Sequence, residues 1–178
     1  MEIKAKTRTE QILTVMHILA WVAFIGFLIE AGAILVSYGV SCVNPEAANN
    51  LYKGLNLYNL RQFNFWHYTL SVSFMVALSC MKAFVSFLAI RTLSKVNLAN
   101  PFKIEVAVIL ERISYVLFGT WLVAMLKSAH TSWLVKITGE LHGSWASGEF
   151  IFMAGLVFII SQIFKRGVEI QSENDLTI

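Results

Sequence analysis

Charged side chains are scarce in this sequence, and their scarcity excludes most classes of soluble protein. Lysine, arginine, aspartate and glutamate together make up 14% of the 178 residues, against about 25% in a typical globular chain. Hydrophobic residues make up 57%, which is above the soluble average of about 45–50%. Intrinsic disorder is excluded too, because it requires low hydrophobicity and high net charge. The sequence therefore predicts an integral membrane protein, with the lipid bilayer as its main partner.

The sequence also lacks the residues and motifs that covalent and metal chemistry require. It has two cysteines, Cys42 and Cys80, with no C-x-x-C pair and no cysteine–histidine cluster at metal-ligand spacing. It contains no G-x-S-x-G, no H-E-x-x-H and no glycine-rich phosphate loop. The net charge of +3 is too small and too dispersed for direct binding of nucleic acid. We therefore predict a protein that is not an enzyme and has no cofactor or metal site.

Four apolar runs are each long enough to cross a bilayer, whose hydrocarbon core requires about 20 helical residues. They cover approximately residues 12–38, 66–90, 106–126 and 149–164. Each run has to be helical, because an open strand edge leaves backbone groups without hydrogen bonds in lipid. The sequence therefore predicts a single all-α membrane domain of four transmembrane helices in a bundle.

Lysine and arginine are distributed unequally over the flanks of these spans. Eight lie in the N-terminal segment, in the connection between the second and third spans, and in the tail over residues 165–178, whereas four lie in the two other connections. Cytoplasmic flanks of membrane proteins carry the excess of basic residues. We therefore predict a multi-pass membrane protein with both termini in the cytoplasm.

The connections between the spans differ in character. The cytoplasmic one is short and polar and contains Asn100-Pro101-Phe102, in which an asparagine N-cap followed by proline predicts that the third helix begins at Pro101. The outer connection over residues 127–148 has apolar residues at helical spacing, which predicts a short helix lying in the membrane interface. These residues are Trp133, Leu134, Ile137, Leu141 and Trp145.

Ionisable residues within the spans are few, and each is a candidate for a structural or functional role. Lys82 lies in the second span, eight residues before its end at residue 90, and Glu111 lies five residues into the third span. Because a short connection joins these spans, we expect them to be antiparallel neighbours and predict an intramembrane ion pair. The pair either fixes the helix register or belongs to an ion path. Because no further titratable group lies at that depth, we favour the role in fixing the helix register over the ion path.

Two further polar residues, Glu30 and Gln162, lie on helix faces that are otherwise built of small residues. Glu30 shares its face with Gly26 and Ala33, and Gln162 shares one with Gly155. Faces of this kind usually meet another helix closely. We therefore expect both residues to face the interior of the bundle, where they are either structural or part of an ion path.

The four histidines are candidate haem ligands, because two imidazoles that face each other from separate helices can bind iron. His17 lies near the cytoplasmic side, whereas His67, His130 and His142 fall at or beyond the outer surface. We interpret the outer three as solvated and predict no haem site.

Two cytoplasmic stretches resemble a known family. They are Asn100-Pro101-Phe102 and the ending from Lys165 to Ile178, whose Glu-Asn-Asp-Leu-Thr followed by an aliphatic residue is the specific part. Together with the four-span layout they resemble the bacterial membrane-protein family catalogued as domain of unknown function 2975. The resemblance implies a small multi-pass protein of the bacterial cytoplasmic (inner) membrane without an established activity. It also implies that the gene often lies beside one for a short cytoplasmic helix-turn-helix regulator.

These residues lead to a prediction about function. The inner connection and the tail are the main cytoplasmic surfaces, so a soluble partner has to use them. We predict one docking face for a helix-turn-helix protein, with the acidic tail attracting a basic domain. Its residues are Asn100, Pro101, Phe102, Glu173, Asn174, Asp175, Leu176 and Thr177. The protein would then be a membrane-bound antagonist or sensor for that regulator. A small transporter or channel subunit is the alternative.

Overall fold

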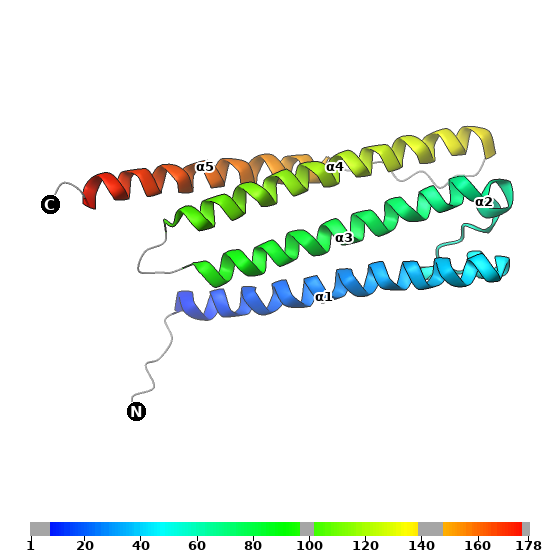
Figure 1. The fold of residues 1–178 in the computed structure, drawn as a ribbon, viewed down its shortest axis with the longest axis horizontal. Coiled ribbons are helices and arrows are strands. Elements are labelled where there is room, and N and C mark those ends of the chain that lie inside the picture. The colour runs from blue at the N-terminus through cyan, green and yellow to red at the C-terminus, as the bar shows by residue number, and fades with distance from the viewer. Residues whose placement is uncertain (1–7, 97–101, 139–147, 176–178) are drawn as a thin grey trace, which may run out of the picture.

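The computed structural model describes residues 8–96, 102–138 and 148–175 (Figure 1). Among these residues the long helices are α1 (Arg8–Val43), α3 (Phe65–Lys95), α4 (Ile104–Thr138) and α5 (Glu149–Asp175). Three short helices, η1 (Pro45–Asn49), η2 (Tyr52–Gly54) and α2 (Tyr58–Phe63), connect α1 to α3. Each long helix is long and apolar enough to cross a membrane. The predicted all-α class with four membrane-spanning helices is confirmed.

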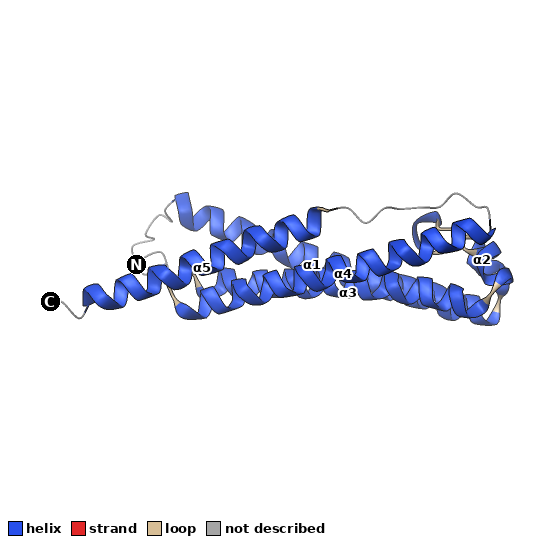
Figure 2. Ribbon diagram, turned by 90° about the horizontal axis from the view of Figure 1, so that it is seen from above, coloured by secondary structure: helices blue, strands red, loops and turns tan. Residues whose placement is uncertain are grey.

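The long helices form an open row in which each packs mainly on its neighbour. α1 packs on α3, α3 on α4, and α4 on α5, and Figure 1 places α1 and α5 at opposite edges. The start of α1 and the end of α5 lie at the same end of the molecule, which we call the tail end (Figures 1 and 2). The opposite end carries η1, η2 and α2, and we call it the cap end. That the tail end faces the cytoplasm stays a prediction.

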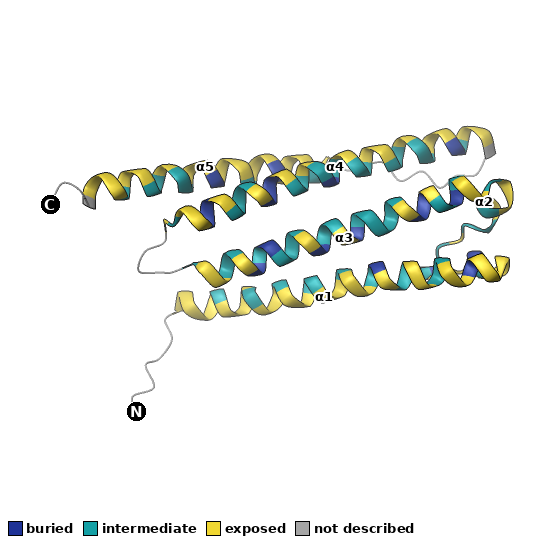
Figure 3. Cartoon of the chain, in the orientation of Figure 1, coloured by how far each residue is buried: buried dark blue, intermediate teal, exposed yellow. Residues whose placement is uncertain are grey.

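The two edges of the row expose a largely apolar surface. The most apolar stretch of α1 contains no buried residue, and Ile18, Val22 and Ile29 are each more than half exposed. Figure 3 shows exposed residues along α1 and α5, and more buried ones along α3 and α4. Hydrocarbon can cover such a surface without cost, whereas water cannot. The distribution of burial therefore fits helices that are surrounded by lipid.

The most tightly packed core lies at the cap end. Its fully or nearly fully buried members are Ala48, Leu51, Tyr68 and Val72. The Tyr68 side chain has no exposed surface, and its hydroxyl lies 2.5 Å from Oγ of Ser41 on α1. The hydroxyl of Tyr38 lies 3.0 Å from Oγ1 of Thr69. The cap thus joins the end of α1 to the start of α3 through buried rings and hydrogen bonds.

The helices are longer than the predicted spans. α4 has 35 residues, about 52 Å at 1.5 Å per residue, against a hydrocarbon core of about 30 Å. Residues 127–138 continue α4 without a break, so this part of the predicted interfacial helix is wrong. Leu141 and Trp145 lie outside the described residues. α5 begins beside the middle of α4 (Figure 1), so the last turns of α4 project past it toward the cap end.

At the tail end, α4 begins later than predicted and α5 continues past the predicted fourth span. α4 begins at Ile104, whereas the predicted start, Pro101, lies outside the described residues. α5 continues to Asp175, eleven residues beyond the predicted span end at residue 164. Phe102 and Lys103 are not helical.

Candidate functional site

Phe102 joins the inner connection to α5 at the tail end. The centroid of its ring lies 5.5 Å from that of Phe164, and its face covers Gly167. A Cβ atom at Gly167 would overlap the Phe102 ring, so only glycine leaves room for the ring at this position. Segments that are about sixty residues apart in sequence are thereby held together.

A hollow of about 620 Å³ lies beside the Phe102 ring. Its lining residues are Phe102, Ile163, Arg166, Gly167, Ile170, Gln171 and Asn174. Of the predicted docking residues, the structure therefore brings Phe102 and Asn174 together. Glu173 lies on the same last turns of α5, and Asp175 ends that helix. Asn100, Pro101, Leu176 and Thr177 lie outside the described residues.

Glu111 has a different partner from the predicted one. Nζ of Lys165 on α5 lies 2.9 Å from Oε1 of Glu111 on α4, and both side chains are mostly covered. The Tyr115 hydroxyl is 3.5 Å from the same carboxylate oxygen. Nζ of Lys82 instead lies over the ring of Phe27, 5.8 Å from its centroid. The predicted pairing of Lys82 with Glu111 is therefore wrong.

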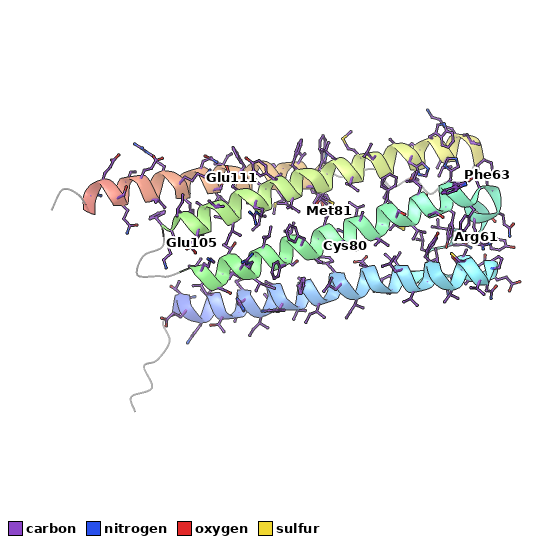
Figure 4. All side chains as sticks on the ribbon, in the orientation of Figure 1. Arg61, Phe63, Cys80, Met81, Glu105 and Glu111 are labelled. Atoms are coloured by element: carbon purple, nitrogen blue, oxygen red, sulfur yellow. The ribbon has the colours of Figure 1, made fainter. Side chains whose placement is uncertain are left out.

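The register between α3 and α4 explains this difference. Lys95 forms an ion pair with Glu105 near the tail end, and the end of the Met81 side chain lies 3.2 Å from the position that a Cβ of Gly119 would take. Figure 4 shows Met81 in the space between α3 and α4, and Glu111 farther toward the tail end. Lys82 is therefore level with residues near Gly119, about 12 Å along the helix from Glu111.

Three further charged residues line a cavity of about 210 Å³ between α1, α3 and α4. Glu30, Lys82 and Lys127 each contribute to its lining, and together they come from all three helices. The other lining residues are mostly apolar: Ile34, Leu51, Tyr52, Leu55, Val72, Met75, Leu78 and Ser79. No ion pair joins the three charges in the part of the chain that the structure describes. We call this space the central cavity.

Glu30 lines the central cavity, in agreement with the expectation that it faces the bundle interior, whereas Gln162 does not line it. Glu30 shares this space with Lys82 and Lys127. Gln162 is exposed on α5, and its side-chain amide donates a hydrogen bond to Oγ of Ser161 at 3.3 Å. With two ammonium groups and one carboxylate, the cavity has an excess of positive charge that favours an anion.

A pair of histidines was missed by the sequence analysis. Nδ1 of His67 on α3 lies 3.2 Å from Nε2 of His130 on α4, and the ring of Trp133 packs against both. The prediction that these two histidines are solvated is wrong. Within residues 8–96, 102–138 and 148–175, no group of three or more potential ligands is placed to hold a metal ion.

Comparisons with known proteins place the chain in a family. No curated protein and no solved structure matches it. The family described as protein of unknown function (DUF2975) matches residues 41–178, more than three quarters of the chain. That match includes the inner connection and the tail, which carry the resemblance seen in the sequence. The chain therefore belongs to the DUF2975 family.

Proposed function

We propose that this protein is a membrane-bound binding module that holds a small cytoplasmic helix-turn-helix regulator at its tail end. The observation that carries the proposal is the contact of Phe102 with α5 at Gly167. It joins the inner connection and the tail into one surface with a hollow beside it. The proposed module has no enzyme activity of its own and acts by sequestering or sensing for its partner.

The chemistry of this surface suits a basic protein domain. Phe102, Ile163 and Ile170 are 39%, 59% and 47% exposed, so they offer apolar contact area at the hollow. The last turns of α5 carry Glu173 and Asp175, whose charge attracts basic partners and guides their approach. Protein interfaces commonly combine a buried apolar anchor with a polar rim of this kind.

The first prediction tests this surface directly. In lipid nanodiscs, the full chain is expected to bind the purified helix-turn-helix protein that is encoded beside its gene. Ile170→Lys should weaken the binding at least about tenfold, because it removes an apolar contact and adds repulsion toward a basic domain. Deletion of residues 172–178 should do the same while leaving the membrane helices in place. Biolayer interferometry measures the Kd of each variant.

The control is Val43→Lys, which places the same new charge at the cap end. Val43 is 88% exposed, so its replacement is expected to leave both stability and binding unchanged. Equal affinity of the wild type and the Ile170→Lys variant contradicts the proposal, and so does the absence of any such regulator beside the gene.

The central cavity favours a second function, that of a small transporter or channel subunit for anions.

The second prediction is that proteoliposomes containing the chain conduct chloride, and that Lys127→Met reduces the flux at least about tenfold by removing an attractive charge from the cavity. Lys136→Met is the control, because Lys136 is exposed on the same helix. A chloride-sensitive dye inside the vesicles reports the flux. Flux equal to that of empty vesicles rules this function out.

A further inference from the structure

A groove between α3 and α4 combines a long apolar lining with a single cation. Its volume is about 400 Å³, and its lining residues are Cys80, Met81, Phe84, Arg112, Tyr115, Val116 and Gly119. Met81 and Gly119 approach closely at one end, and Figure 4 shows Cys80 and Met81 on the α3 side of this contact. Arg112 lies at the other end, nearer the tail end. The groove is therefore polar at one end and apolar along the rest.

Arg112 has no acidic partner among the described residues. The ion pairs there join Lys95 to Glu105, Lys165 to Glu111, and Arg166 to Glu169. Glu111 is adjacent to Arg112 in sequence, but it is bound to Lys165 and points about 100° away around the helix. A cation on a membrane-spanning helix is costly unless an anion or the membrane interface compensates it.

The depth of Arg112 places its guanidinium near the lipid headgroups. The residue lies eight positions after the first residue of α4, about 12 Å into the helix. A long arginine side chain can extend from this depth toward the interface at the tail end. The apolar part of the groove then runs from the guanidinium toward the membrane interior, which is the orientation of a phospholipid with its headgroup at the interface.

We propose that this groove binds one anionic phospholipid from the leaflet on the tail-end side. The Arg112 guanidinium binds the phosphate, for which its planar, forked donors are suited. One acyl chain lies along Phe84, Tyr115 and Val116 toward the Met81–Gly119 contact. A free phosphate would leave the apolar groove empty, so the lipid is the occupant that uses both parts. Basic sites between transmembrane helices are known binding sites for anionic lipid headgroups.

The exposed cysteines allow a test on the unaltered protein. Cys80 lines the groove, whereas Cys42 lies at the cap end, and both thiols are free and exposed. In detergent micelles, added phosphatidylglycerol is expected to slow the alkylation of Cys80 by N-ethylmaleimide about fivefold, because the acyl chain covers the thiol. The alkylation rate of Cys42 should not change. Phosphatidylcholine and glycerol phosphate should have no effect on either cysteine.

Variants of Arg112 test the headgroup contact. Arg112→Gln should abolish the protection of Cys80 and reduce the phosphatidylglycerol retained in native mass spectrometry about fivefold. Arg91→Gln removes an exposed arginine near the tail end of α3 and should change neither readout. If Arg112→Gln does not fold, Val116→Trp serves as a second variant. The tryptophan fills the groove and should abolish the protection of Cys80 by phosphatidylglycerol while Arg112 stays in place. Equal protection by phosphatidylcholine, protection by glycerol phosphate, or unchanged lipid retention in Arg112→Gln overturns the proposal.

Discussion

Tyr68→Ala is expected to lower the free energy of unfolding by about 3–5 kcal/mol. The Tyr68 side chain is completely buried, and its ring lies 5.7 Å from that of Tyr38 and 6.2 Å from that of Phe65. Truncation leaves a cavity in the cap core and leaves the Ser41 hydroxyl without its tyrosine partner. Denaturant titration of the purified protein in detergent measures the loss.

Two further substitutions show which part of the tyrosine matters. Tyr68→Phe keeps the ring and removes only the hydroxyl that contacts Ser41, so it should cost about 1–2 kcal/mol. Trp66→Ala is the control for loss of an aromatic ring without a cavity, since Trp66 is 79% exposed, and its effect should stay within about 0.5 kcal/mol. Equal losses in Tyr68→Ala and Trp66→Ala would contradict a cap core centred on Tyr68.

Glu111→Gln is expected to lower the free energy of unfolding, because Lys165 keeps its charge without a partner. The two side chains are only 21% and 32% exposed, which limits compensation by water. Lys165→Met should have a similar effect. The free energy of unfolding of the double variant should fall by less than the sum of the two single decreases, since no isolated charge remains. Unfolding titrations of all four proteins give the coupling energy.

The chain offers matched controls for this pair. Lys95 and Glu105 also form an ion pair, but their side chains are 41% and 62% exposed, so breaking it should lower the free energy of unfolding less than breaking the Lys165–Glu111 pair does. Lys82→Met combined with Glu111→Gln should give additive losses, because these residues lie about 12 Å apart along the helices. A coupling between Lys82 and Glu111 as large as that between Lys165 and Glu111 would refute the register described above.

Hydropathy was sufficient to predict four membrane-spanning helices, because each apolar run has the length that lipid requires. It did not predict where the helices end. The last turns of α4 alternate polar residues such as Lys136 with apolar ones such as Ile137, and this pattern suits an interfacial helix and a projecting helix equally well. The contacts with α3, including that of His130 with His67, are between residues far apart in the sequence.

Contacts between specific side chains were harder to predict than the spans. A short connection indicates that two helices are neighbours, but it does not set their register, and so Glu111 was assigned to Lys82 rather than to Lys165. The sequence did place the inner connection and the tail on one side, which anticipated the meeting of Phe102 with α5. Nothing in a single sequence distinguishes Gly167, which accommodates that ring, from the other nine glycines.

The offset between α4 and α5 leaves α4 as the neighbour through which α5 is connected to the cap end. α5 begins beside the middle of α4 (Figure 1), whereas α4 runs from Ile104 at the tail end to Thr138 at the cap end. α5 is held mainly by α4, so a displacement of the cap would reach the proposed docking surface chiefly along this helix. Proline is the commonest cause of a sharp helix bend, and α4 contains none. α4 therefore lacks the commonest cause of a bend, and a straight helix can pass a movement at the cap end to the tail end.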